Sequence, residues 1–142
     1  MRLTVRLGAI LAGLILAAGG PAMAQGGALE SAPRSDAEFV AGLFASGDFV
    51  RASDRFAEPL RREWTPEKLA AWWSDITARL GQCTSQDAKA VELDGIEWRI
   101  HVVCRFERGY ADLVLTFPTV GDPSRVLAFA VAYEGATPPR SY

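Results

Sequence analysis

Apolar residues after the first thirty-odd positions recur at helical spacing. Four of them share one helical face because they follow a period of about 3.6 residues: Phe39, Val40, Leu43 and Phe44. Just before them, Ser35–Glu38 fits a capping box, in which the serine and glutamate side chains satisfy free amides of the first turn. Gly47 can adopt the left-handed conformation that ends many helices. The pattern predicts a helix that begins at Ser35 and ends before Gly47.

Two further helices are expected before the strands begin. Asp48 is a suitable N-cap for a short second helix. The apolar residues of that helix, at spacings of three and four, are Phe49, Ala52 and Phe56. Pro59 is expected to break the region that follows, whereas Thr65 and Pro66 suit the N-cap and first position of a third helix. Gly81 is expected to end the third helix, whose apolar stripe is Leu69, Trp72, Trp73, Ile76 and Leu80.

After Gly81 the hydrophobic period changes to two, which is typical of strands that bury one face. The ranges that we expect as strands are 83–91, 96–106, 110–118 and 125–133. In the clearest strand, Cys104 belongs to the apolar face, whereas His101, Val103 and Arg105 point to the opposite face.

The hairpin between the second and third strands has a register that can be counted. A two-residue loop at Arg108-Gly109 places Glu107 opposite Tyr110. The same count gathers the large apolar residues on one face and sets an arginine opposite an aspartate. The resulting pairs are Arg105 with Asp112, Val103 with Val114, His101 with Thr116, and Cys104 with Leu113.

Three helices followed by four antiparallel strands predict an α+β fold. The three N-terminal helices would pack on the apolar face of one curved four-stranded antiparallel sheet. We expect this domain to span residues 35–134. Residues 25–34, with small residues, glycine and proline, predict a flexible leader, and residues 135–142 predict a loose C-terminal tail.

The first 24 residues have the pattern of a cleavable secretory signal peptide. Arg2 and Arg6 supply a positive n-region, residues 7–18 form an uncharged apolar run, and Ala22-Met23-Ala24 resembles a cleavage site. The apolar run is shorter than the ~20 residues that cross a bilayer as a helix. We therefore expect a periplasmic or secreted protein with no stable membrane insertion after cleavage.

Composition narrows the classes of partner. The chain has 142 residues, of which 49% are hydrophobic and 23% charged, and this suits one globular domain. Its formal charge of −2 becomes −4 when Arg2 and Arg6 leave with the signal peptide. Nucleic acid is not an expected partner, because its binding depends on clustered lysine and arginine.

Cys83 and Cys104 are the two cysteines of the chain. An exported compartment is oxidising, and an even cysteine count there favours pairing. Counting along the strands places both residues on one face, directly opposite or diagonal according to the length of the first turn. We expect a disulfide between them, which would stabilise the domain by ~3 kcal/mol in the chain-entropy model.

Several short motifs, taken in order, resemble the family known as domain of unknown function 3887. The matching segments are Phe39-Val40, Gly47-Asp48-Phe49, Trp64–Leu69, Val103–Gly109, Asp112-Leu113 and Leu115-Thr116-Phe117. The resemblance covers roughly residues 35–133. It implies the nuclear transport factor 2-like superfamily, whose fold is a cone of helices on a curved sheet. It implies no catalytic residues, and members of the family occur alone in exported bacterial proteins.

We expect no catalytic, cofactor-binding or metal site. His101 is the single histidine, and Cys104 points to the opposite face of its strand, so the two do not form a nucleophilic pair. One histidine and two paired cysteines do not make a zinc site. Tyr110 and Asp112 are suitable residue types for an acid–base pair, but Arg105 is the expected partner of Asp112.

Two surfaces remain as candidates for binding. A pocket in the mouth of the cone would be lined by Phe39, Leu43, Trp72, Trp73 and Trp98. The outer face of the sheet would contact a partner through His101, Val103, Arg105, Asp112 and Val114, beside a stripe of small side chains from Ala128, Ala130 and Ala132. The leading expectation is an exported, soluble, non-enzymatic binding domain, either a homodimer through its sheet or bound to another exported protein. The alternative is a small enzyme or a lipophilic-ligand carrier with a pocket inside the cone.

Overall fold

The computed structural model describes residues 24–133, so residues 1–23 of the predicted signal peptide and the predicted tail at 135–142 lie outside the described residues. Four helices precede four strands: α1 (Ala24–Ser46), α2 (Phe49–Asp54), α3 (Glu58–Glu63), α4 (Pro66–Leu80), β1 (Cys83–Asp94), β2 (Glu97–Phe106), β3 (Gly109–Pro118) and β4 (Ala128–Tyr133). The strands form one antiparallel sheet in the order β1-β2-β3-β4. The predicted α+β class, with helices packed on a curved, open sheet, is confirmed.

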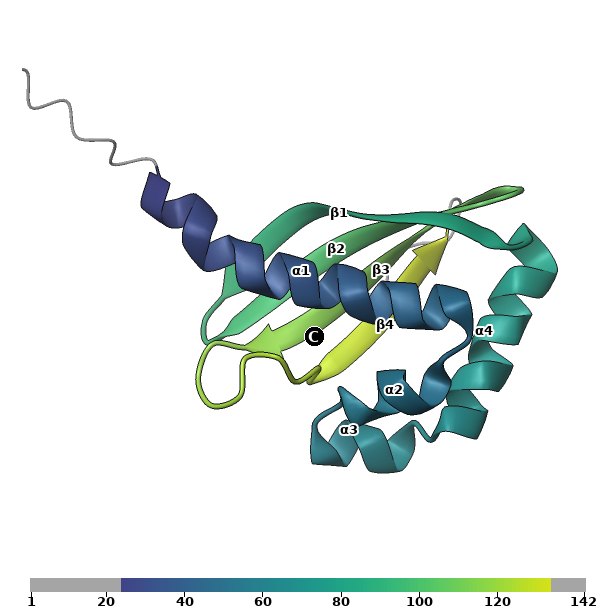
Figure 1. Ribbon diagram of the computed structural model, residues 1–142, viewed down its shortest axis with the longest axis horizontal. Coiled ribbons are helices and arrows are strands. Elements are labelled where there is room, and N and C mark those ends of the chain that lie inside the picture. Colours follow the sequence, from purple (N-terminus) through teal and green to yellow (C-terminus); the bar gives the residue numbers. More distant parts are fainter. Residues whose placement is uncertain (1–23, 134–142) are drawn as a thin grey trace, which may run out of the picture.

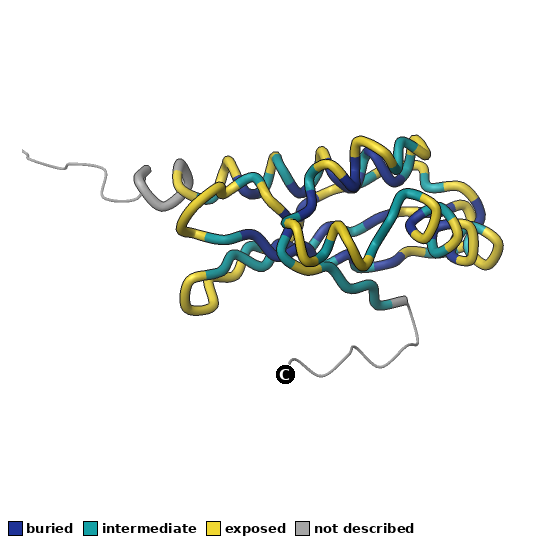
Figure 2. The backbone as a smooth tube through the Cα atoms, turned by 90° about the horizontal axis from the view of Figure 1, so that it is seen from below, coloured by how far each residue is buried: buried dark blue, intermediate teal, exposed yellow. Residues whose placement is uncertain are grey.

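The helices cover one face of the sheet. Figure 1 shows α1 lying across the strands, with α4 at one end and α2 and α3 beside β4. In the perpendicular view the buried stretches of α1 and the strands face one another between two layers (Figure 2). The core is built from alternate strand residues and the inner side of the helices, and its largest fully buried members include Phe44, Phe56, Phe117, Leu69 and Ile100.

Helix α1 differs from the sequence prediction at its start. It begins at Ala24 and runs through residues 25–34, which we had predicted to be a flexible leader, with Pro33 inside the helix. The Arg34 guanidinium donates to the Ala88 carbonyl at 2.6 Å, and a Glu38 carboxylate oxygen accepts from the Ala88 amide at 3.0 Å. The capping box at Ser35 was therefore wrong, because Glu38 reaches the sheet instead of the start of its own helix.

The predicted N-caps of two helices and the predicted end of α1 are confirmed. Asp48 caps α2 through the Arg51 amide at 3.3 Å, and Thr65 caps α4 with Pro66 in the first turn. Gly47, at φ 75°, ends α1 as predicted. Helix α3 is an addition: Pro59 lies in its first turn, where the missing amide costs no hydrogen bond, so the proline begins a helix instead of only breaking one.

The strands follow the prediction, but the β2–β3 register is two residues away from it. Phe106 pairs with Gly109, so the turn is Glu107-Arg108, and Val103 pairs with Asp112. The predicted partner of Asp112, Arg105, pairs with Tyr110 instead. A shift of two preserves the faces of both strands, which is why the hydrophobic pattern could not reveal it.

Contacts with α4 fix this turn in place. The Arg108 amide donates to the Leu80 carbonyl at 2.8 Å, and the Glu107 amide donates to the Gln82 carbonyl at 3.1 Å. The Arg108 guanidinium donates to the carbonyls of Ala78 and Arg79, each at 3.3 Å. These bonds satisfy carbonyls at the end of α4, and they supply a tertiary reason for the turn position that local turn rules do not contain.

Candidate functional site

Four of the five residues predicted to line a cone pocket belong to the hydrophobic core or pack against it. Leu43 and Trp73 belong to the buried core, at 5% and 7% exposure, and Trp72 packs partly buried against it. Phe39 lies on the surface of α1, where the guanidinium carbons of Arg51 and Arg55 stand 5.6 and 4.7 Å from its ring centre. Trp98 lies on β2 opposite Phe117.

Aromatic side chains fill the space between α4 and the sheet. Phe44 stands at the centre, with ring centres of Phe56, Trp72, Trp73 and Phe129 all within 6.5 Å of its own. Trp73 continues the cluster to Phe106 at 5.6 Å. These contacts make the layer between α4 and the sheet part of the hydrophobic core.

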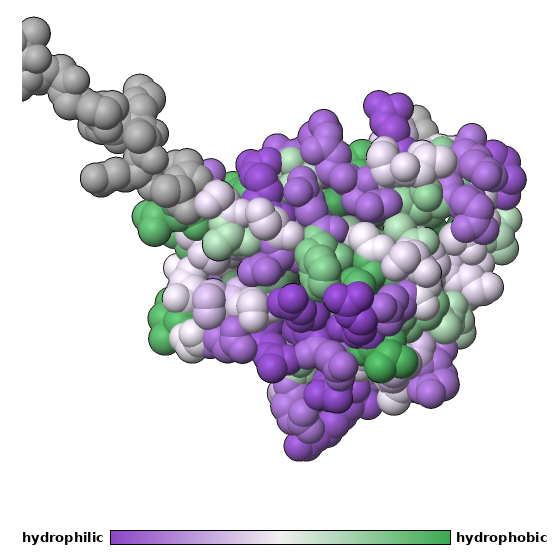
Figure 3. Space-filling view, viewed as in Figure 1, coloured by the Kyte–Doolittle hydropathy of each residue, from purple (hydrophilic) through white to green (hydrophobic). Residues whose placement is uncertain are grey.

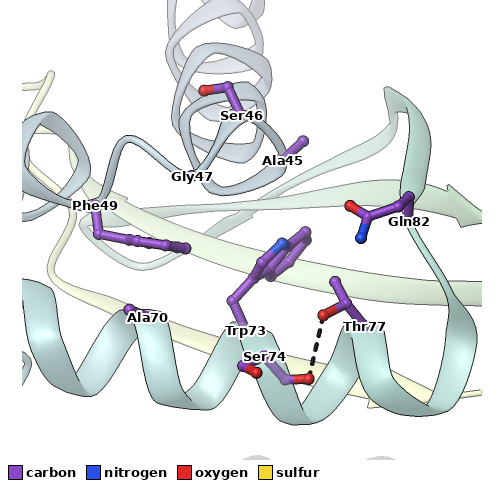
Figure 4. Close-up of a pocket in the computed structure, with 9 residues that line it drawn as sticks. All are labelled: Ala45, Ser46, Gly47, Phe49, Ala70, Trp73, Ser74, Thr77 and Gln82. Atoms are coloured by element: carbon purple, nitrogen blue, oxygen red, sulfur yellow. Dashed lines mark hydrogen bonds between the residues drawn. The ribbon is translucent and has the colours of Figure 1, made fainter.

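Two hollows on the described residues lie at the surface. One, of about 210 Å³, is lined by Phe39, Arg51, Asp54 and Arg55. The other, of about 280 Å³, lies between the end of α1 and α4, with Trp73 and Phe49 projecting into it and Gln82 at its rim (Figure 4). Thr77 there uses its hydroxyl to donate to the Ser74 carbonyl at 3.1 Å. Both hollows are open to solvent, and Trp73 is the one buried core residue that borders the second.

The predicted sheet-face residues do come together. His101 and Val103 on β2 and Asp112 and Val114 on β3 lie on the outer face, opposite the helices. Nδ1 of His101 lies 2.8 Å from Oδ2 of Asp112, and its Nε2 lies 3.7 Å from Oε1 of Glu92 on β1. Asp112 is thus held by His101, which corrects the predicted ion pair with Arg105. Its second oxygen, Oδ1, is buried without a partner among the described residues.

The rest of this face divides into a charged part and an uncharged part. On the β1–β2 side, Arg99 forms an ion pair with Asp94 at 2.7 Å, and Arg105 is exposed. On the β3–β4 side, register pairs of Val114 with Ala130 and of Thr116 with Ala128 are uncharged. Ala132 completes the predicted stripe of small side chains on the outer face. The outer face therefore carries charges of both signs and, beside them, an uncharged area of small side chains.

The histidine–aspartate pair can hold an imidazole in a fixed orientation. Its free nitrogen faces the Glu92 carboxylate instead of a hydroxyl or thiol, so the arrangement suits a charge network across three strands. Among residues 24–133, no group of three histidine, cysteine or acidic residues is placed to hold a metal ion. The same described range has no helix long and apolar enough to span a membrane.

The prediction of a disulfide between the two cysteines is wrong. Cys83 and Cys104 are free thiols, so the predicted disulfide is absent. Two irregularities in the β1–β2 ladder set Cys83 opposite Phe106 and Gln86 opposite Cys104. A hydrogen bond from the Cys104 thiol, and one from the Gln86 amide at 3.1 Å, lower the pKa of Cys83 to about 6. The same contact with Cys83, together with burial, raises the pKa of Cys104.

Sequence reasoning missed Glu92 and Arg99 as members of the charged network. Both occupy outward positions in strands, and Glu92 pairs with Arg99 in the register. Extending the first predicted strand beyond residue 91 would have placed Glu92 on the same face as His101, because side chains alternate along a strand. The weak alternation of residues 83–91 concealed that extension.

Comparisons with known proteins supply no relative for this arrangement. No family model matches the chain, and searches of the curated proteins and of the solved structures found no significant match.

Proposed function

We propose that this chain is a non-catalytic binding domain that self-associates through its sheet. The observation that carries the proposal is the outer face of the sheet, which no described helix covers. Its uncharged part on β4 consists of small side chains from Ala128, Ala130 and Ala132. Small side chains on a pleated surface allow close approach of a second polypeptide, and exposed surfaces of this kind mark protein contacts.

Charge supports a second copy of the chain as the partner. A two-fold dimer contacts itself through one patch, so that patch must be complementary to itself. Arg99 and Arg105 supply positive charge beside the uncharged area, while Glu92 and Asp112 supply negative charge. Two copies that meet through the sheet therefore bring charges of both signs together, without net repulsion.

The helix side of the molecule supports the same choice. Seen from the side on which α1 lies, hydrophobic patches are small and separated by hydrophilic residues (Figure 3). The alternative function, a small enzyme or lipophilic-ligand carrier, needs an enclosed apolar pocket. The packing of Phe44 against its four aromatic neighbours occupies the place where that pocket would be.

The proposal includes export to the periplasm or the medium. The signal-peptide pattern of residues 1–24 and the resemblance to exported members of the domain of unknown function 3887 family support this part of it. Intact mass of the chain purified from a bacterial host tests it, because export with cleavage removes residues 1–24. A recovered chain that still begins at Met1 contradicts cleavage.

Sedimentation velocity tests self-association. The full chain is expected to sediment as a dimer, and Ala130→Glu is expected to shift it to a monomer, because it adds a charge of the same sign to β4 of both copies. Ala71→Glu is the matched control, because Ala71 is exposed on α4 away from the sheet. Monomeric wild-type chain at every concentration overturns the proposal, and so does equal weakening by both variants.

A further inference from the structure

We infer that two copies of the chain join edge to edge through β4 and form one continuous eight-stranded antiparallel sheet. The inference rests on the proposed self-association and names its seam. β4 is an edge strand that pairs only with β3 among the described residues (Figure 1). Strand edges carry unpaired amides and carbonyls, which form a template for another strand.

The direction of the free backbone groups follows from the ladder. The Thr116 carbonyl accepts from the Leu127 amide at 2.8 Å, so Thr116 turns its backbone polar groups toward β4. Its register partner Ala128, and then Ala130 and Ala132, turn theirs toward β3 in return. Because these groups alternate along a strand, Phe129 and Val131 direct their amides and carbonyls to the open edge.

Nothing in the sequence of β4 protects this edge. The strand reads Ala-Phe-Ala-Val-Ala-Tyr, with no charge and no proline. Natural edge strands usually carry a lysine, a proline or a bulge that prevents pairing with another chain. An uncharged edge can meet its own copy in an antiparallel register without like charges in contact.

The opposite edge of the same sheet shows those protections. β1 contains two irregularities, between Cys83 and Ser85 and between Ala88 and Ala90, and it carries four charged residues. Two side chains of α1 bind the backbone of Ala88 at this edge. The Arg34 guanidinium donates to its carbonyl, and the Glu38 carboxylate accepts from its amide. One receptive edge and one protected edge close the assembly at two copies, because a second addition has no place to occur.

Apolar side chains beside the β4 edge remain partly exposed. Phe129 lies with its ring centre 4.9 Å from that of Trp64 and 5.1 Å from that of Trp72, and all three are only half-buried. Val131, next along the inner face, is half-buried too. A second copy at this edge would extend the sheet over these groups and complete their burial.

Symmetry fixes the register of the seam. A two-fold axis between antiparallel strands runs through the sheet, so the helices of both copies lie on one side and each residue meets a residue of the same face. We place the two-fold axis at Val131, whose backbone amide and carbonyl point to the open edge of β4. Val131 therefore faces Val131 of the second copy, and the two exchange both backbone hydrogen bonds.

A proline at this position tests the seam with little effect on the fold. Val131→Pro removes an amide that points out of the sheet, so β3–β4 pairing is retained. Val131→Ala is the matched control, because it shortens the side chain and keeps the amide. Val114→Arg tests the competing arrangement, in which the outer faces of two sheets pack together.

The inference predicts a particular pattern in sedimentation velocity, with circular dichroism to verify folding. Wild type, Val131→Ala and Val114→Arg are dimers, and Val131→Pro is a folded monomer whose dissociation constant is at least tenfold weaker. Dimeric Val131→Pro overturns the edge seam and leaves self-association standing. If Val114→Arg is the variant that loses the dimer and Val131→Pro keeps it, the edge seam is also overturned, and face packing is favoured. A monomeric wild type overturns both this inference and the proposed function. If Val131→Pro fails to fold, loss of dimer in full-length chain N-methylated at the Val131 amide supports the seam, and retention overturns it.

Discussion

His101 and Asp112 are joined across the β2–β3 ladder, with Nδ1 of the imidazole 2.8 Å from Oδ2 of the carboxylate. The two residues are two positions out of direct opposition, because Asp112 pairs with Val103 and His101 pairs with Val114. The side chains therefore meet diagonally on the outer face, where they are 27% and 37% exposed. The contact links the charged and uncharged parts of that face.

This contact is expected to contribute little to stability. Partly exposed ion pairs contribute ~0.2–1 kcal/mol in double-mutant cycles, and Asp112 already has one buried oxygen without a partner. We predict a coupling free energy in that range between His101→Ala and Asp112→Ala, measured by urea unfolding. A coupling of several kcal/mol would show that the pair is a structural element and not a surface network.

The Glu38 carboxylate is expected to matter more than its place on a helix surface indicates. Glu38→Ala leaves the Ala88 amide without its acceptor in a partly buried position, and such a loss costs ~1–3 kcal/mol. Glu30→Ala, two turns earlier on α1, is the control. Urea unfolding of both variants decides the point, and equal stabilities would remove the anchoring role of Glu38.

Gly81 is expected to tolerate no side chain. It has φ 82° and ψ −164°, a backbone region that is essentially limited to glycine. A Cβ there would lie 2.5 Å from Oε2 and 2.8 Å from Cβ of Glu107. We predict that Gly81→Ala lowers the free energy of unfolding by ~2 kcal/mol or more.

Gly95→Ala serves as the control for that substitution. Gly95 also has a positive φ, of 63°, but a Cβ there meets nothing within 4 Å. Its cost is expected to be ~1 kcal/mol, the backbone part alone. Equal costs in thermal or urea unfolding would show that the contact with Glu107 relaxes freely.

The two thiols are expected to react very differently. Because the Cys104 thiol and the Gln86 amide donate to Cys83, its pKa falls to about 6, and its thiolate form dominates above that pH. Alkylation of Cys83 should therefore rise between pH 5 and 7 and level off, whereas an ordinary cysteine is half ionised only near pH ~8.5. Cys104, with a raised pKa and a buried side chain, should stay unlabelled.

Peptide mass spectrometry after timed iodoacetamide treatment measures both rates. Gln86→Leu removes one donor and is expected to move the Cys83 profile to higher pH. A Cys83 rate that still climbs above pH 8, or equal labelling of Cys104, would refute the assigned contacts.

The fold could be predicted because its elements are specified locally. Asp48 and Thr65 cap their helices through backbone amides a few residues away, and alternation assigns the faces of β2, β3 and β4 correctly. The β2–β3 register could not be predicted, because the bonds of Arg108 to the end of α4 join residues about thirty positions apart. A shift of two leaves the hydrophobic pattern unchanged, so only the tertiary contact decides it.

The same limit applies to the candidate site. Face assignment correctly grouped His101, Val103, Asp112 and Val114, since it needs only the period of two. The counted position of Cys83 was right, since it lies opposite Phe106 and diagonal to Cys104, yet both thiols are free. The Gln86 amide, opposite Cys104 in the ladder, donates to the Cys83 thiol at 3.1 Å, a contact that counting along strands does not reveal. Four of the predicted pocket residues lie in or against the core, because a domain of this size needs its large apolar side chains for packing.

The mass of the chain in solution, measured by light scattering during size-exclusion chromatography, tests the central claim most directly. Self-association through the sheet predicts twice the mass of one chain at high concentration, with dissociation on dilution. The mass of a single chain across the whole concentration range would contradict it.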